Sequence, residues 1–180
     1  TKMKDKVCLI EGNIEVSYFE LWENIEKLAK VFLKVGIKEN DKVIIILPNC
    51  KEFIYSFYGL ARINAVSIPL NTYLTSCELD KIFKECNPRV VICTYELYKK
   101  KIYPLLNKEI LIILTDELLE LGRDNIFEVK ELLVKARKGK LPRFSAYNDQ
   151  IATINYTYRG LGKPLGAMLT HGNYHHGAIG

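Results

Sequence analysis

The sequence predicts an α/β protein with a largely parallel sheet wrapped by helices. The first observation is a set of short, uninterrupted aliphatic runs, the pattern of strands buried on both faces of a parallel sheet. The second is that segments with apolar residues at helical spacing lie between these runs. Strands that alternate with helices in this way favour right-handed βαβ units. The longer runs are residues 43–47, 90–93 and 110–114.

Composition limits the broad class of protein. The chain has 180 residues, enough for one domain or one lobe of a larger one, and its 48% apolar and 26% charged residues are typical of a soluble globular protein. The net charge of +5 suits anionic ligands, and we do not expect nucleic acid as a partner. No secretory signal and no run near the roughly 20 apolar residues that span a bilayer are visible, so we expect a cytoplasmic protein. The five cysteines stand alone and are expected to be core residues or incidental thiols.

Turn and capping signals predict the first elements. Residues 7–16 alternate around a Gly-Asn pair, which predicts a hairpin. Ser17 with Glu20 forms a capping box for an amphipathic helix that ends at Gly36. Trp22 widens the apolar face of this helix, so we expect its side chain in the core.

Two more capping boxes predict where the following helices begin. Asn49 with Glu52 predicts a helix that runs to about Asn64, and Thr75 with Glu78 predicts the next helix. The other predicted elements are a strand at 66–68 and a helix at about 95–106.

Residues 115–150 show less regular periodicity and are predicted to form an irregular connector. Five cations fall within nine residues here without an intervening acid, which allows either a patch for polyanions or a solvated linker. Aromatic residues are not interleaved and acidic residues precede the cluster, so we expect the linker. The five cations are Lys135, Arg137, Lys138, Lys140 and Arg143.

A Gly-rich stretch follows the apolar run at 151–154. Three glycines and a proline within seven residues favour a loop over a continued strand or helix, and this loop carries Arg159 and Lys163 but no acid. Such a loop can bring backbone N–H groups to a phosphate. The Walker and dinucleotide-binding spacings both fail, so the pattern alone supports an anion cradle and a plain structural turn equally. The four residues are Gly160, Gly162, Pro164 and Gly166.

The same stretch resembles the phosphate loop of the adenylate-forming enzymes, a family of acyl-CoA synthetases, luciferases and peptide-synthetase adenylation domains. The matching frame is Tyr156-Thr157, Gly162-Lys163-Pro164, Gly166 and the segment from Met168 to Asn173. Where the family has Ser-Gly-Thr-Thr, this chain has Tyr158-Arg159-Gly160-Leu161, and Leu165 replaces the lysine after the proline. Segments within residues 17–79 also resemble the opening part of acyl-CoA synthetases, in the same order.

The resemblance implies the N-terminal lobe of an acyl-CoA synthetase-like fold. We expect a βαβ core at 1–114, a connector at 115–150, and a strand, phosphate loop and helix start at 151–180. The strand at 151–154 is expected to need sheet neighbours from later sequence. The residues expected on the phosphate side are Thr157, Arg159, Gly160, Gly162 and Lys163, with Arg159 in place of the missing hydroxyls.

The resemblance also implies a function. It implies an ATP-dependent ligase, most similar to fatty-acid or small-acid acyl-CoA synthetases, that uses ATP, Mg²⁺ and coenzyme A on a small-molecule carboxylic acid. The family's catalytic residues come later in the chain, so we expect no turnover by these residues without the remainder of the ligase. The alternative is a non-catalytic nucleotide-binding or partner-binding module with a degenerate loop. For His171 and His175 we expect a structural role and no metal site.

Overall fold

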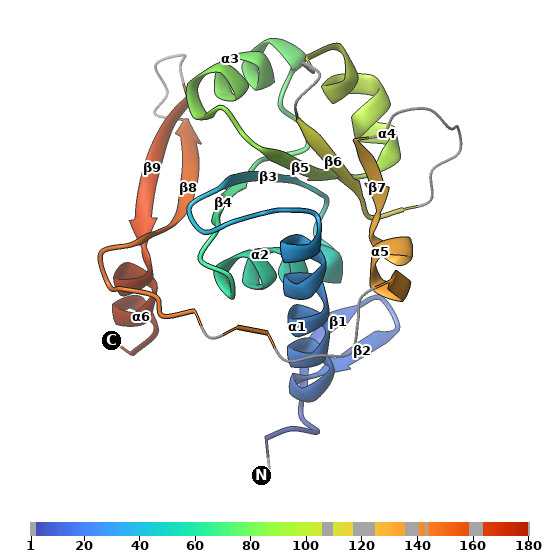
Figure 1. Ribbon diagram of the computed structural model, residues 1–180, viewed down its shortest axis with the longest axis vertical. Coiled ribbons are helices and arrows are strands. Elements are labelled where there is room, and N and C mark those ends of the chain that lie inside the picture. The colour runs from blue at the N-terminus through green and yellow to red at the C-terminus, as the bar shows by residue number, and fades with distance from the viewer. Residues whose placement is uncertain are drawn as a thin grey trace.

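The computed structural model describes residues 3–105, 110–116, 125–135, 141–142, 144–158 and 164–179. A seven-stranded sheet with the order β7-β6-β5-β3-β4-β8-β9 forms the centre, and β1 and β2 form a separate hairpin (Figure 1). All neighbours in the large sheet are parallel except β8 and β9. The predicted α/β class with a largely parallel sheet is therefore confirmed.

The bounds of the elements are as follows. The strands are β1 Val7–Glu11, β2 Ile14–Ser17, β3 Lys42–Ile46, β4 Val66–Pro69, β5 Val90–Cys93, β6 Leu111–Leu114, β7 Ile126–Glu128, β8 Ile151–Tyr158 and β9 Pro164–Thr170. The helices are α1 Tyr18–Lys34, α2 Lys51–Ala61, α3 Ser76–Cys86, α4 Tyr95–Leu97, the π-helix η1 Tyr98–Ile102, the 3₁₀-helix η2 Tyr103–Leu105, α5 Val129–Lys135 and α6 His171–Ile179.

Helix α1 begins and ends as the sequence predicts, but Trp22 does not enter the core. Both hydrogen bonds of the Ser17–Glu20 capping box are present, and Gly36 adopts a positive φ of 87° just beyond the helix. The side chain of Trp22 is 55% exposed. The buried face of α1 centres on Leu28 and Phe32, and Trp22 lies about a quarter of a turn away from the middle of that face. The expectation of a core tryptophan was wrong for this reason.

Helix α2 does not have the predicted capping box. Its N-cap is Cys50, whose backbone is extended and whose side chain makes no capping bond, so the helix starts one residue too late for Asn49 and Glu52 to act as a box. Glu52 pairs with Lys51 at 3.3 Å instead. The box formed by Thr75 and Glu78 at the start of α3 is present as predicted.

The large sheet is buried between two hydrophobic cores. Alternate strand residues point to opposite faces, so Val43 and Ile45 of β3 enter one core while Ile44 and Ile46 enter the other. Helices α1, α2 and α5 cover the first face, and α3, α4 and η1 cover the second (Figure 1). Every one of these four β3 side chains is fully buried, which explains the continuous aliphatic run.

The region predicted as an irregular connector contains two further elements. Strand β7 pairs in parallel with β6, and Val129 and Leu132 of α5 are buried in the core beneath α1. β7 is only three residues long, too short to show a periodicity. Most of the cation cluster at 135–143 lies outside the described residues, so the linker interpretation stays a prediction.

Residues 164–170 form a strand, which corrects the prediction that Pro164 and Gly166 belong to a loop. β9 pairs antiparallel with β8, and Gly166 lies opposite Tyr156. A Cβ on Gly166 would come within 2.9 Å of Ile154 Cγ2 and 3.3 Å of the Tyr156 ring, so the glycine allows close packing and does not mark a turn. Pro164 is the first residue of the strand, where proline is tolerated.

Strand β8 has neighbours on both sides within this chain, contrary to expectation. It pairs in parallel with β4, where Ser67 aligns with Thr153, and on its other side with β9. The Ser67 hydroxyl donates to the Ala152 carbonyl at 3.5 Å. The apolar run at 151–154 is therefore an interior strand of the sheet, with both of its neighbours in the described part of the chain.

The five cysteines are free thiols, and Cys86 and Cys93 are buried in the core on the α3 face. In the described ranges, no helix has the length and apolarity needed to cross a membrane.

His171, at the start of α6, gives the fold a predicted pH dependence. Its Nε2 atom is buried without a hydrogen-bond partner among the described residues, and burial lowers the pKa of the imidazole from its ordinary value near 6.5. The unfolded chain therefore binds the proton more readily than the folded one. The stability that the neutral, buried imidazole contributes is present above pH 6.5 and is lost as the pH falls below that value. We expect the free energy of unfolding to drop less between pH 7 and 5 in His171→Gln than in the wild type, measured by urea denaturation. Equal pH profiles for His171→Gln and the wild type would contradict the prediction.

Candidate functional site

The order of the strands places a candidate site at the carboxyl ends of β3 and β4. The chain leaves β3 for α2 on one face of the sheet and leaves the adjacent β4 for α3 on the other face. Two neighbouring parallel strands whose connections separate in this way leave a crevice at their carboxyl ends, where open α/β sheets bind ligands. Leu70 and Asn71 follow β4 directly into this position.

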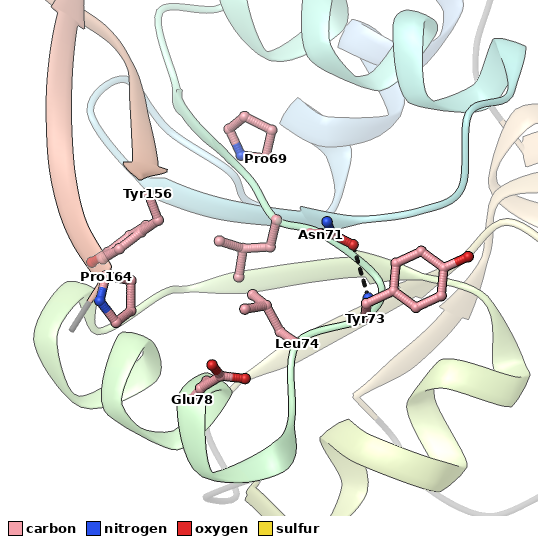
Figure 2. Close-up of a pocket in the computed structure, with 8 residues that line it drawn as sticks. Pro69, Asn71, Tyr73, Leu74, Glu78, Tyr156 and Pro164 are labelled. Atoms are coloured by element: carbon pink, nitrogen blue, oxygen red, sulfur yellow. Dashed lines mark hydrogen bonds between the residues drawn. The ribbon is translucent and has the colours of Figure 1, made fainter. Parts of the chain in front are cut away.

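A pocket of about 290 Å³ lies at this edge, and we refer to it as the carboxyl-edge pocket. Figure 2 shows Tyr156 and Pro164 on one side and the segment after β4 on the other. Ser67 aligns with Thr153, so β8 continues three residues past the level of Pro69 and the β8–β9 hairpin extends over the pocket. The lining residues are Pro69, Leu70, Asn71, Tyr73, Leu74, Glu78, Tyr156 and Pro164.

Local hydrogen bonds shape the segment after β4. The backbone N–H of Leu70 donates to the Ile45 carbonyl at 2.8 Å, which ties the start of the segment to β3. The side chain of Asn71 turns the chain by accepting from the N–H of Tyr73 at 2.9 Å (Figure 2). The N–H of Leu74 donates to the Asn71 carbonyl at 3.2 Å, and α3 begins at Ser76. The pocket wall is therefore an ordered turn.

The polar groups of the pocket differ in the roles that they can take. Burial raises the pKa of the Tyr156 phenol, and the nearby Cys86 and Glu85 side chains add to the shift. The phenol is therefore neutral at physiological pH and able to donate a hydrogen bond. The carboxylate of Glu78 accepts from the N–H and hydroxyl of Thr75 at 2.8 and 2.7 Å, so its first task is to cap α3.

The structure describes Thr157 among the five residues expected to contact phosphate. Thr157 is exposed on β8 and lies opposite Leu165. Because side chains alternate along a strand, it faces the side of the sheet opposite Tyr156 and does not line the carboxyl-edge pocket. Arg159, Gly160, Gly162 and Lys163 lie outside the described residues, in the connection between β8 and β9.

Asn71, Tyr73 and Tyr156 were not among the site residues predicted from the sequence. The signal that could have found the first two is their place directly after a parallel strand, at the point where successive connections change face. That change of face depends on the strand order. It arises because the chain crosses back after β4, so that β5 lies on the opposite side of β3 from β4. Tyr156 was part of the matching frame but had no assigned role.

The described residues do not provide a set of ligands for a protein-held magnesium ion. In the described ranges, no three or more His, Cys, Asp or Glu side chains are grouped so that they could hold a metal. Of the residues that line the pocket, Glu78 alone carries a carboxylate, and Thr75 already bonds to it. The residues that line the pocket therefore fit an uncharged organic group better than a bare cation.

The fold and the pocket together define an open α/β protein with a candidate ligand site at the carboxyl edge of its sheet. The family model described as AMP-binding enzyme matches residues 1–180, and the chain belongs to that family. Among curated proteins, it is 28% identical over 175 residues to the 4-coumarate–CoA ligase of Vanilla planifolia, a match that covers 95% of this chain and 31% of the ligase.

Solved structures show the same fold. A benzoate CoA ligase from Burkholderia xenovorans LB400 superposes with a TM-score of 0.81 and 21% identity, over 98% of this chain and 34% of that one. The anthranilate CoA ligase AuaEII, solved in complex with anthranoyl-AMP, gives a TM-score of 0.80 and 20% identity over 96% and 33%. The chain thus spans about a third of the length of the relatives that it matches.

Proposed function

We propose that this chain is the N-terminal part of an ATP-dependent ligase that activates a small carboxylic acid as an acyl-adenylate and then forms an acyl-CoA thioester. The observation that carries the proposal is the carboxyl-edge pocket under the β8–β9 hairpin, in a chain that matches the AMP-binding enzyme family along its whole length. The relatives named above are CoA ligases, and one neighbour was solved with an acyl-AMP, which supports the same reaction class.

In the proposed reaction, a carboxylate oxygen attacks the α-phosphorus of ATP, and the bond to pyrophosphate breaks. The thiolate of coenzyme A then attacks the acyl carbonyl, and AMP leaves. Such phosphoryl transfer depends on positioning and on neutralising phosphate charge. We assign this work to Thr157, the backbone at Gly160 and Gly162, and the cations Arg159 and Lys163. Magnesium would arrive on the ATP phosphates and supply further positive charge there.

A second function is favoured by the composition of the loop. Tyr158-Arg159-Gly160-Leu161 lacks the hydroxyls of the Ser-Gly-Thr-Thr sequence that the family carries. A chain that kept the fold but lost phosphate binding would be a non-catalytic nucleotide-binding or partner-binding module. A partner-binding module would have no affinity for ATP, and a nucleotide-binding module would bind ATP without activating a carboxylic acid in the complete protein.

Two measurements on the 180-residue protein test the proposal. Titration calorimetry with MgATP should detect binding, and pyrophosphate release with ATP, magnesium and a panel of carboxylic acids should stay at background. Pyrophosphate release that depends on one of the acids would overturn the expectation that these residues alone do not turn over. The absence of any ATP affinity would overturn the ligase proposal and favour the non-catalytic module.

A further inference from the structure

The wall of the carboxyl-edge pocket is attached to a distant lysine. The Nζ atom of Lys101 donates to the carbonyl of Thr72 at 2.7 Å and to the carbonyl of Leu74 at 2.8 Å. These carbonyls belong to the segment in which Asn71, Tyr73 and Leu74 line the pocket. Both bonds are charge-assisted because the donor is an ammonium. Lys101 is also partly buried, which limits the access of competing water.

The neighbouring lysines have different partners. Lys99 lies over the ring of Tyr95 at 5.4 Å, and Lys100 pairs with Glu96 at 2.6 Å on an exposed surface. All three lysines belong to the π-helical turn η1, Tyr98–Ile102. A π-turn adds a residue to the helical repeat and redirects the side chains that follow, and such turns are frequent at functional sites. In this case Lys101 is the lysine directed toward the pocket wall.

We propose that Lys101 is a positioning residue for the carboxyl-edge pocket: its ammonium holds the turn at 71–74 in place and thereby sets the position of the pocket wall. The ammonium donates to two carbonyls of the turn, whereas the Asn71 side chain makes a different bond there by accepting from the N–H of Tyr73. The role as a clamp depends only on the structure. Its effect on ligand binding rests on the function proposed above.

Amide hydrogen exchange of the Lys101→Met protein tests the clamp. The N–H groups of Tyr73 and Leu74 are both hydrogen-bonded within the turn, so their exchange rates report how often it opens. We expect them to exchange at least about 10-fold faster in Lys101→Met, because the loss of even one of the two charge-assisted bonds, about 1.5 to 3 kcal/mol, corresponds to about 10-fold to 150-fold. The amides of Ile44 and Ile45 in β3 should be unchanged. Lys100→Met is the matched control and should leave Tyr73 and Leu74 at the wild-type rate.

Two outcomes of the exchange experiment would overturn the proposal. Unchanged exchange at Tyr73 and Leu74 would show that the turn holds itself, and equal acceleration in β3 would show a general loss of stability instead of a local clamp. Titration with MgATP tests the effect of the clamp on ligand binding separately from the clamp itself. Weaker binding in Lys101→Met than in Lys100→Met supports the positioning role, and equal binding overturns it. If the wild type binds no ATP, the proposed function fails, while the exchange rates still decide whether Lys101 clamps the turn.

Discussion

Replacing Phe32 by alanine should lower the free energy of unfolding by about 3 to 5 kcal/mol, the range observed when a buried aromatic ring is truncated. Phe32 is fully buried in the core between α1, α2 and the sheet. Its ring is also the nearest neighbour of Gly59, where an added Cβ would lie 3.1 Å from Phe32 Cε2. The ring therefore fills the space where the two helices come closest, and its removal leaves a cavity that they cannot easily close. Urea denaturation followed by circular dichroism measures the change.

Phe19→Ala is the matched control because it removes the same ring from the same helix. The Phe19 side chain is 44% exposed, and its ring is approached by Lys4 at 5.6 Å. An exposed cation–π contact contributes about 0.5 to 1 kcal/mol, so this variant should lose little more than that. If Phe32→Ala lost no more free energy of unfolding than Phe19→Ala, the result would contradict the packing of Phe32 between α1 and α2.

Replacing Arg159 by alanine should weaken the binding of MgATP about 10-fold to 150-fold. Three hydroxyls of the family's loop are missing here, and Arg159, which stands at the glycine of Ser-Gly-Thr-Thr, is the cation gained within the same four residues. A guanidinium offers a planar set of five donors suited to phosphate oxygens. One charge-assisted bond of about 1.5 to 3 kcal/mol corresponds to this change in affinity. Titration calorimetry on the two proteins gives the ratio directly.

Lys163→Ala serves as the comparison for Arg159→Ala. The ammonium of Lys163 lacks the planar set of donors of a guanidinium, so we expect a smaller loss of affinity there. Both residues belong to the connection between β8 and β9, and each change removes one positive charge. A purely long-range effect of charge would weaken binding equally in the two variants. If the wild type and Arg159→Ala bound MgATP with equal affinity, the result would contradict the proposal that Arg159 compensates for the missing hydroxyls.

The predictions that succeeded depended on signals within a few residues. The capping boxes at Ser17 and Thr75 and the buried strand β3 follow from local hydrogen bonding and from an unbroken aliphatic run. The predictions that failed concerned side chains whose surroundings are set by tertiary packing. Trp22 has the right residue type and spacing for a core, but its side chain is more than half exposed at the margin of the buried face of α1. Gly166 was predicted to be a turn residue from its local sequence. Its close neighbours Ile154 and Tyr156 lie on the adjacent strand β8, and only the pairing of β8 with β9 brings them together.

The candidate site was predictable only in part for the same reason. The loop that follows β8 is contiguous in sequence, so its glycines and cations could be recognised from the pattern and the resemblance. The carboxyl-edge pocket combines residues 69–78 with residues 156 and 164, and its wall is held by Lys101 from 27 and 29 positions away. Such combinations follow from strand order and helix phase, which composition and periodicity do not encode.

The pairing of β4 with β8 has a consequence for synthesis on the ribosome. The Ser67 hydroxyl and the Ala152 carbonyl that it contacts are 85 positions apart in the chain. At roughly 5 to 20 residues per second, β4 waits on the order of 4 to 17 s before its neighbour has been translated. During that interval β4 presents an unpaired edge of apolar residues, the kind of edge that recruits strands from other chains. Slow translation through residues 70–150 should therefore increase the fraction of nascent chains that depend on chaperones.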